Sequence, residues 1–401
     1  MMPRDDKNTS VFVDGDLSHA ETQRRGEFFS RKERIDRKGW KRVRLGDVLS
    51  YEQPYSYIVN NREYSKAGTP VLTPGKTFIL GYTQETHGLC HATPQAPRIL
   101  FDDFLTISRL VEFDFKVKSS AVKILSPTSE DCNLRFLFYA MSQLRFDVVD
   151  HQRHWIGQFS KLEIAIPKRY EQDKIAAAIM ACDTHIAALQ SLIAKYEAIK
   201  KATVNLLLKP KAGWRHVKLG DICLSFAYGV GASAIPYDGT NRYIRITDID
   251  DDSHKFKPSP LSSPSHFRYD HIVKDGDILI ARTGASVGKS YIYHQNDGKL
   301  IFAGFLMRAA INHGLADPYF IFLQTLTNKY RLWVAEESMR SGQPGLNINQ
   351  CKGFEFFLPK ISEQRKIASQ ITAIDKVLND CKKQLDKAKN LKQGMMSYFF
   401  G

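Results

Sequence analysis

The sequence predicts an α+β protein in which two mixed α/β domains form a pseudo-two-fold repeat and are separated by two long antiparallel coiled-coil helices. The segment Gly39–Asp47 returns as Gly213–Asp221 with Gly, Trp, Val, Leu, Gly and Asp in register. A second segment, Ile166–Ala176, returns as Leu358–Ala368, and a long stretch without proline follows each copy. Because both segments repeat in the same order, the chain consists of two similar halves.

Residues 1–38 are polar, charge-mixed and outside the repeat, so we expect a flexible tail there. The two domains are expected at residues 39–165 and 213–358, each of ordinary domain size. The segments expected within them are strands in 69–80 and 121–125 and a helix over 134–144, and then strands in 243–246 and 277–281 and a helix over 317–329.

A segment that we expect to form one long helix follows each domain: 166–212 follows the first domain and 359–401 the second. Apolar residues recur there in a 4-3-4-3 stride, which favours coiled-coil packing of the two helices on one another. At 1.5 Å per residue, a helix from Glu171 to Leu208 is about 57 Å long. The residues expected to pair the helices are Ile175, Ile179, Ile186, Leu189, Ile367, Ile371, Leu378 and Leu385.

Both helices are expected to begin at a Glu-Gln-x-Lys-Ile-Ala sequence that follows a proline. An acidic residue in the first turn faces the positive end of the helix dipole, so the motif is explained by helix initiation. A second interpretation is that Glu171, Gln172, Glu363 and Gln364 also contact a partner subunit.

The 401 residues carry 57 Lys and Arg against 43 Asp and Glu, a formal net charge of +14. Segments 166–212 and 359–401 contribute +4 and +5 of it, whereas each expected domain contributes only +2. A basic excess is typical of proteins that meet phosphate. Here most of the positive excess lies on the two helical segments, so neither domain is strongly basic.

No membrane or secretion signal is expected. No stretch approaches the roughly 18 uninterrupted apolar residues of a spanning helix, and the first residues lack the apolar core of a signal peptide. The six cysteines are scattered without CxxC spacing, which is typical of reduced thiols. We therefore expect a cytoplasmic protein.

The segment Thr283–Ser290 approaches a phosphate-binding loop but has three residues between Gly284 and Gly288 where that loop needs four. A hairpin-like turn that needs glycine for positive φ is expected instead. In addition, the turn could present Arg282 and other polar side chains to a groove.

Two further near-motifs also favour structural roles. Asp317–Phe320 lacks one proline of the motif with which amino-methyltransferases hold a base, so Asp317 is expected to cap a helix that begins with Pro318. His151 and His154 have no convincing third metal ligand, and no metal site is expected.

Two polar loops, around 151–155 and 341–349, lie shortly before the second repeated segment of each half, and we expect them to be equivalent by position. Their Arg, Gln, Asn and His side chains are of the types that read base edges. A merely polar surface loop is the other interpretation.

The chain resembles the specificity (S) subunit of type I restriction–modification enzymes. The likeness covers nearly everything from Gly39 onward, and it rests on the repeated segments, on Val71–Thr83 with Phe101–Phe104, and on Gly276–Lys289. The resemblance implies two target-recognition domains that each read one half of a bipartite DNA sequence. It also implies that the chain has no catalytic activity of its own.

The resemblance further implies partners. In this family one S subunit binds two modification (M) subunits, which carry S-adenosylmethionine and methylate adenine. The complex recruits restriction (R) subunits, which use ATP and Mg for translocation and cleavage. We therefore expect double-stranded DNA as ligand and no cofactor or metal in this chain. Because each domain is nearly neutral, tight DNA binding is expected only with the M subunits bound.

The residues predicted to approach DNA lie in the turns and polar loops of both halves. They are Lys76, Tyr82, Gln152, Arg153, Arg282, Thr283, Ser286, Lys289, Gln343 and Asn347. Two other functions compete with DNA recognition: an assembly protein that dimerises through its helices and binds protein, and a self-sufficient methyltransferase. The absence of a Gly-rich methyl-donor loop argues against the methyltransferase.

Overall fold

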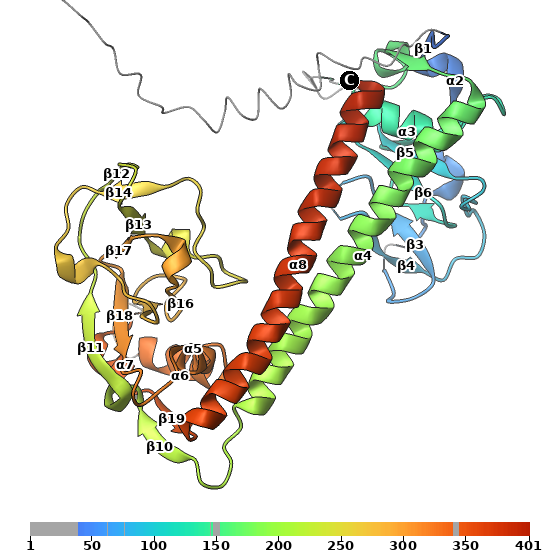
Figure 1. Cartoon of the computed structure of the whole chain (residues 1–401). Helices are drawn as coiled ribbons and strands as arrows, with labels where there is room; N and C mark the ends of the chain where they lie inside the picture. The colour runs from blue at the N-terminus through green and yellow to red at the C-terminus, as the bar shows by residue number, and fades with distance from the viewer. Residues whose placement is uncertain (1–38, 62, 76, 145, 147–152, 340–344) are drawn as a thin grey trace, which may run out of the picture. The chain divides into compact units, whose positions relative to one another are not determined.

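The computed structural model describes residues 39–61, 63–75, 77–144, 146, 153–339 and 345–401 (Figure 1). Their contacts form two compact units. The first unit contains the described residues up to Ala188 together with Leu385–Gly401, and the second contains Leu189–Gln384. The mixed α/β class and the internal repeat are confirmed. Each unit includes part of both long helices, so the division into separate domain and helix segments stays a prediction.

The first unit is built on a four-stranded antiparallel sheet of order β2-β8-β5-β6. A smaller sheet, β4-β3-β7, contains one parallel pair, and β1 pairs with β9. Its elements are β1 (Lys41–Arg44), α2 (Leu45–Val48), β2 (Leu49–Glu52), η1 (Pro54–Tyr57), β3 (Thr69–Leu72), β4 (Ile79–Thr83), β5 (Arg98–Asp102), β6 (Ser108–Val111), β7 (Lys116–Val117), β8 (Val122–Pro127), α3 (Leu134–Ser142), η2 (Phe159–Lys161), β9 (Glu163–Ile166) and the start of α4 (Arg169–Leu207).

The second unit repeats this topology. The order β11-β18-β15-β16 matches β2-β8-β5-β6, the parallel pair β13·β17 matches β3·β7, and β10·β19 matches β1·β9. Its elements are β10 (Arg215–Lys218), η3 (Leu219–Ile222), β11 (Cys223–Tyr228), β12 (Ala234–Pro236), β13 (Arg242–Ile244), η4 (Ile246–Asp248), β14 (Ser262–Pro264), η5 (Tyr269–His271), β15 (Ile278–Ala281), β16 (Ser290–Ile292), η6 (Gln295–Asp297), β17 (Leu300–Phe302), β18 (Leu306–Ile311), α5 (Pro318–Gln324), α6 (Asn328–Ser338), α7 (Ile348–Lys352), β19 (Glu355–Leu358) and α8 (Ile361–Phe400).

The helix expected over 317–329 is wrong in its extent. It ends at Gln324, and a separate helix, α6, begins at Asn328. The Thr325 hydroxyl donates to the Phe322 carbonyl, and the Thr327 hydroxyl caps α6 by accepting from the Tyr330 N–H. Threonine side chains that bond to nearby backbone groups in this way favour helix ends over helix interiors.

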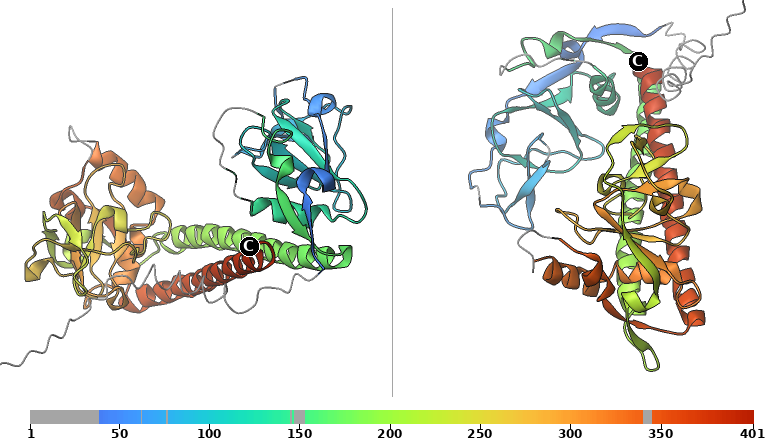
Figure 2. Two further views of the ribbon diagram at one scale, coloured as in Figure 1. Left: turned by 90° about the horizontal axis from the view of Figure 1, so that it is seen from above. Right: turned by 90° about the vertical axis from the view of Figure 1, so that its left-hand side faces the viewer.

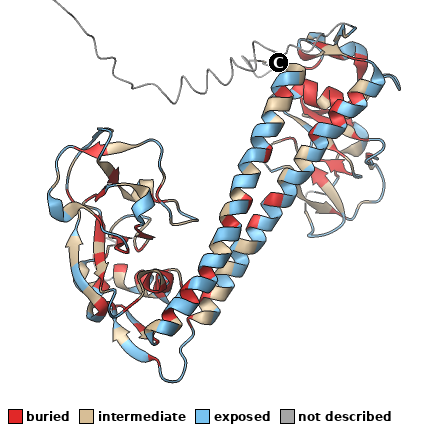
Figure 3. Cartoon of the chain, in the orientation of Figure 1, coloured by how far each residue is buried: buried red, intermediate tan, exposed pale blue. Residues whose placement is uncertain are grey.

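The central strand of each unit is buried on both faces (Figure 3). In β5, Ile99 and Phe101 belong to the core beneath the helices, and Leu100 belongs to a second core on the other face of the sheet. The residues of β15 alternate between two cores in the same way. This burial explains why both strands are nearly continuous apolar runs in the sequence.

Helices α4 and α8 lie side by side and antiparallel within each unit (Figures 1 and 2). In the second unit, Glu197 pairs with Lys382 (2.8 Å) and Lys200 pairs with Asp375 (2.7 Å). As the residue number rises along α4, the number of its ion-pair partner on α8 falls. This confirms the antiparallel arrangement that the apolar 4-3-4-3 pattern predicts.

By length and composition alone, α4 is the one described helix that could cross a membrane. No uninterrupted apolar run marks this helix in the sequence, because alanines raise the hydropathy between the larger apolar residues. The helix buries Ile175, Ile179, Leu189 and Ile193 within the protein. Of its most apolar 18-residue window, 22% is buried within the protein. All six cysteines are free thiols.

Candidate nucleic-acid interface

In the first unit, the central strand β5 is followed by a turn, residues 103–107. This turn is hydrogen-bonded to the loop that precedes β9. The Asp103 N–H donates to the Ala121 carbonyl (3.1 Å), and the Asp103 carbonyl accepts from the His154 N–H (2.8 Å). The Trp155 N–H donates to the Asp103 carboxylate (3.0 Å). We call residues 103–107 the first turn.

The second unit has the same arrangement after β15, at residues 282–289, which we call the second turn. The Arg282 N–H donates to the Phe305 carbonyl (3.0 Å), and the Arg282 carbonyl accepts from the Leu346 N–H (2.8 Å). These bonds match those of Asp103 one for one. The two turns therefore occupy equivalent places in the repeat, and Arg282 corresponds to Asp103.

Arg282 lies on an aromatic ring. Its guanidinium carbon is 4.5 Å from the centre of the Tyr228 ring, and the Tyr228 hydroxyl accepts from the Ile348 N–H (3.2 Å). Phe305, whose carbonyl receives the Arg282 N–H, is 65% exposed. We call Tyr228, Arg282, Phe305 and Asn347 the Arg282 platform.

Asn347 belongs to the platform because it begins α7. Its side chain accepts from the Gln350 N–H (2.9 Å), and the Gln350 side chain accepts from the Asn347 N–H (3.0 Å), which forms a reciprocal cap. Thr283 forms an antiparallel bridge with Gly345. The structure thus brings together three residues predicted to approach DNA, Arg282, Thr283 and Asn347.

The glycines of the second turn have the expected conformation. Gly284 and Gly288 have φ of 78° and 80°, a region that favours glycine. A Cβ at Gly288 would also lie 2.7 Å from the Val334 side chain. The turn prediction is confirmed, and both glycines have structural reasons.

The far end of the second turn faces elsewhere. Ser286 and Lys289 line a cleft of about 760 Å³ beside α4, α6 and α8. The Lys289 ammonium donates to the Ile249 carbonyl (2.9 Å) and to the Asp251 carboxylate (2.7 Å), and it lowers the pKa of Asp251. Lys289 is thus occupied by contacts inside its own unit, so DNA contact by this side chain stays a prediction that its geometry does not favour.

The first turn has the opposite electrostatic character. The Lys123 ammonium lies 3.3 Å from the Asp103 carboxylate, and both side chains are only 1% exposed. The neighbouring Asp102 carboxylate accepts from the N–H groups of Phe104 and Leu105 (2.9 Å each) and so closes the turn. In the first turn, the charged groups of Asp103 and Lys123 are therefore buried and paired with one another.

The other predicted DNA contacts of the first unit lie apart from one another. Arg153 is exposed directly before His154, beside the first turn, whereas Tyr82 is half-buried on β4 of the smaller sheet. Lys76, Gln152 and Gln343 lie outside the described residues, as does His151.

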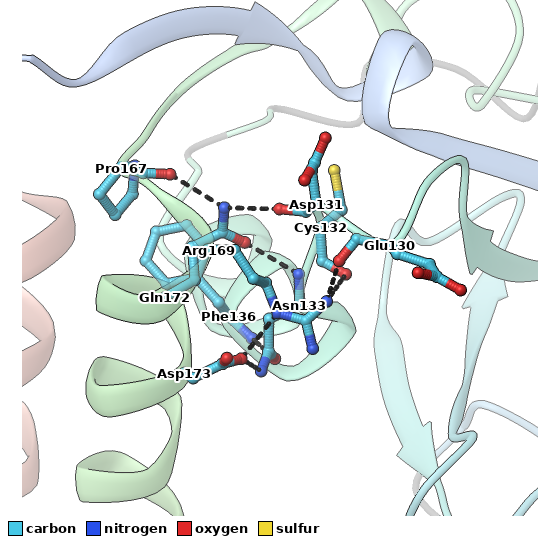
Figure 4. A network of polar contacts seen from close by, with 9 residues as sticks. All are labelled: Glu130, Asp131, Cys132, Asn133, Phe136, Pro167, Arg169, Gln172 and Asp173. Carbon is cyan, nitrogen blue, oxygen red and sulfur yellow. Dashed lines mark hydrogen bonds and ion pairs between the residues drawn. The ribbon is translucent and has the colours of Figure 1, made fainter.

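The helix start of the first unit is a polar network (Figure 4). The Gln172 side chain is buried, accepts from the Asn133 N–H (2.9 Å), and donates to the carbonyls of Asp131 (3.1 Å) and Pro167 (3.0 Å). Asn133 in turn caps α3. Gln172 therefore fixes the start of α4 against the start of α3.

Gln364 does the same in the second unit. It accepts from the N–H of Asp317, the cap of α5, and donates to the Pro359 carbonyl (2.8 Å each). Glu363 accepts from the Trp214 indole N–H (3.2 Å). The structure does not support partner contact for either glutamine, because both side chains are buried within their own units.

The residues predicted to pair the helices are mostly covered. Ile175, Ile179, Leu189, Ile367, Ile371 and Leu378 are buried, Ile186 and Leu385 are half-buried, and the Glu171 side chain is half-buried at the helix start. A polar contact accompanies them. The Tyr139 hydroxyl of α3 and the Lys392 ammonium of α8 both donate to Asp183 of α4 (2.9 and 2.6 Å). The corresponding residues of the second unit are Tyr319, Asp375 and Lys200.

Burial and the Asp183 carboxylate both raise the pKa of the Tyr139 hydroxyl well above its ordinary value. The tyrosine therefore stays a hydrogen-bond donor at any physiological pH. Among the described residues, no group of His, Cys, Asp and Glu is placed to hold a metal ion.

Sequence reasoning missed Tyr228 and Phe305. Neither belongs to a motif, and each reaches the Arg282 platform only because β11, β15 and β18 are neighbours in one sheet. An aromatic residue at a strand end was the only local signal.

Comparison with known proteins gives one consistent result. The family model for the type I restriction modification DNA specificity domain matches residues 37–198 and again 211–389. The Type I restriction enzyme EcoR124I/EcoR124II specificity subunit of Escherichia coli is 46% identical over 127 residues, and the match covers 31% of this chain and 31% of that relative's length.

Two solved structures share the fold. The S subunit of a type I restriction–modification system from M. genitalium has a TM-score of 0.64 at 16% identity, covering 90% of this chain and 96% of that one. A chain from a study of complex assembly and conformational transition of the type I R-M system has a TM-score of 0.51 at 16% identity, covering 92% and 99%. At these identities the likeness concerns the fold.

Proposed function

Since this chain belongs to the type I restriction–modification DNA specificity family, we propose that it selects the DNA target of a type I restriction–modification complex and catalyses no reaction itself. The observation that carries this function is one fold unit present twice, whose equivalent turns bear different side chains. Two units with one fold and different surfaces suit a target with two different halves, because bases are distinguished by individual side chains.

Each unit would present its turn and the adjoining loop to the major groove. In the second unit these are the Arg282 platform and Thr283, with Gln343 from the loop. In the first unit they are the loop residues Gln152 and Arg153, with Lys76 and Tyr82 from the smaller sheet. Side chains on a backbone fixed by hydrogen bonds lose little entropy on binding, which favours specific contacts.

The partners follow from the family. We propose two M subunits that hold S-adenosylmethionine and R subunits that use ATP and Mg, with no cofactor in this chain. Because the basic excess lies on the helical segments and each domain is close to neutral, the chain alone would bind DNA weakly. Tight binding would require the M subunits.

The helices would set the spacer between the two half-sites. Two recognition modules that enter the major groove from one side lie about 34 Å or more apart. Helices of 39 and 40 residues are long enough for this span, at 1.5 Å per residue.

Mapping methylated adenines tests the function directly. The chain is co-expressed with its M subunit in a strain without other adenine methyltransferases, and the genome is sequenced for modified bases. We expect one split motif with two defined halves. A continuous motif, or methylation that persists without this chain, contradicts the proposed function. In vitro, the purified complex should bind duplex DNA with a steep salt dependence, whereas a protein-binding assembly factor would show none.

A further inference from the structure

We propose that Arg282 reads a guanine in the half-site contacted by the second unit, and that Tyr228 is a positioning residue that holds the Arg282 guanidinium for this contact. This assignment rests on the function proposed above and goes beyond it, because it names one base and the side chain that recognises it.

The backbone of Arg282 is fixed from both sides. Its N–H donates to the Phe305 carbonyl and its carbonyl accepts from the Leu346 N–H, so the residue is held between the start of β18 and the loop before α7. The Arg282 guanidinium lies over the Tyr228 ring, and the Tyr228 hydroxyl accepts a hydrogen bond from the Ile348 N–H at the start of α7. The side chain is therefore pre-organised before DNA binds.

One donor of the guanidinium is unsatisfied inside the unit. The Arg282 Nε is buried, and among the described residues none accepts a hydrogen bond from it. A buried donor without an acceptor is costly, so the side chain is not held there by its own hydrogen bonds. Because Nε is shielded from solvent, the terminal guanidinium nitrogens would be the atoms that meet an external acceptor. Arginine presents its donors as a flat fork, and the O6 and N7 atoms of guanine offer two acceptors with the matching spacing.

The surroundings favour a base over a phosphate. Phe305, whose carbonyl accepts from the Arg282 N–H, is 65% exposed, and an exposed apolar ring suits the edge of a base or the methyl group of a thymine. A phosphate-binding arginine would gain nothing from that neighbour. The stack on Tyr228 also fixes the direction of the fork, which a phosphate contact does not require.

The first unit cannot make the same contact. Asp103 occupies the equivalent position, and its carboxylate is buried against Lys123 and the Trp155 N–H. The guanine contact should therefore belong to one half-site only.

The experiment uses the full chain in its complex with the M subunits. Methylation motifs are mapped for wild type, Arg282→Gln and Arg282→Lys. For wild type we expect guanine at one position of one half-site. In Arg282→Gln the preference for guanine at that position should fall roughly 10- to 100-fold, with adenine gaining, because glutamine pairs with adenine. The other half-site should not change.

Arg282→Lys separates a base contact from a phosphate contact. Lysine keeps the charge and loses the fork, so guanine discrimination should drop while the salt dependence of binding stays the same. If Arg282→Gln instead weakens binding equally for all sequences and Arg282→Lys restores it, the contact is to phosphate and the assignment is wrong. A wild-type split motif without guanine in either half would overturn it too, and would leave the proposed function intact.

Tyr228 gives the positioning test. Tyr228→Phe keeps the ring under Arg282 and loses the bond to Ile348, whereas Tyr228→Ala removes the ring. We expect Tyr228→Phe to keep the motif and Tyr228→Ala to relax the same position as Arg282→Gln. Arg268→Gln is the matched control, since Arg268 is an exposed arginine of the same unit paired with Asp270. Loss of discrimination in that variant would contradict the assignment.

Discussion

Asp103 and Arg282 occupy the same place in two copies of one fold, and they carry opposite charges. In the first unit the aspartate is buried and joined to Lys123. In the second unit the arginine is half-buried, and its guanidinium lies over the ring of Tyr228. The backbone hydrogen bonds around the two positions are nevertheless the same.

The difference teaches how this fold can vary in sequence specificity. The turn is held by backbone groups, which any residue supplies, so the side chain is free to change. One copy uses the position for stability and the other leaves it available for a ligand. The predictions below separate these two uses.

Breaking the buried pair should have the largest effect. Lys123→Met leaves the Asp103 carboxylate buried without its partner, and such losses cost about 3–5 kcal/mol. We expect a lower free energy of unfolding of the first unit, measured by denaturant titration of the full chain. The double variant Lys123→Met/Asp103→Asn should recover much of the loss, because no charge is then left buried and the amide oxygen still accepts from the Trp155 N–H.

The matched change in the second unit should behave differently. Arg282→Met removes a half-exposed cation and leaves no buried charge behind, so stability should change by less than about 1 kcal/mol. If Arg282→Met and Lys123→Met destabilise the protein equally, the two positions do not differ as described.

The helix starts provide the next test, because here the two units agree. Gln172→Met and Gln364→Met each keep the side-chain volume and leave a buried N–H without its acceptor, at a cost of about 1–3 kcal/mol. The two losses should be similar when measured by thermal unfolding. Gln172→Glu and Gln364→Glu are the comparison. They keep the acceptor but lose the donor to the Pro167 or Pro359 carbonyl and bury a carboxylate, so both should lose more stability than the methionine variants. Strongly unequal losses would show that the glutamines are not equivalent.

The sequence predicts the repeat, the long helices and the caps, because each depends on local patterns such as apolar stride, proline and glycine. Asp317 and the positive φ of Gly284 and Gly288 are examples. It misses the break between α5 and α6, which depends on threonine side chains bonding to nearby backbone groups.

The candidate site was predictable only in part. Arg282, Thr283 and Asn347 belong to segments that the sequence marks, but Tyr228 and Phe305 reach them through sheet neighbours far along the chain. The paired contacts to Asp183 and Asp375 could have been found, since these aspartates lie 192 residues apart, as Glu171 and Glu363 do. The tyrosines that bind them could not, because Tyr139 and Tyr319 come from different turns of equivalent helices.

The cap of the Arg282 platform should have a smaller effect on stability. Asn347→Ala removes the acceptor for the Gln350 N–H, and loss of such a cap costs about 1 kcal/mol. Asn347→Asp keeps the cap and is expected to restore stability. Unchanged unfolding of Asn347→Ala would show that the cap is not needed.

The pH dependence of stability also distinguishes the two units. Burial raises the pKa of Asp277 above the ordinary value of an aspartate, so its contribution to stability is present below that ordinary pKa and is lost as the pH rises through the raised pKa. The hydrogen bond from Lys116 lowers the pKa of Glu85 in the first unit, so that contribution is present at neutral pH and is lost as the pH falls. Relative to wild type, Asp277→Asn should therefore gain thermal stability between pH 4 and pH 7. Glu85→Gln should be less stable than wild type at pH 7, because it leaves the buried Lys116 ammonium without its carboxylate, and the difference should shrink as the pH falls below the ordinary pKa of a glutamate. If Asp277→Asn and Glu85→Gln follow the same trend with pH, the Asp277 and Glu85 carboxyls do not differ in the way the structure indicates.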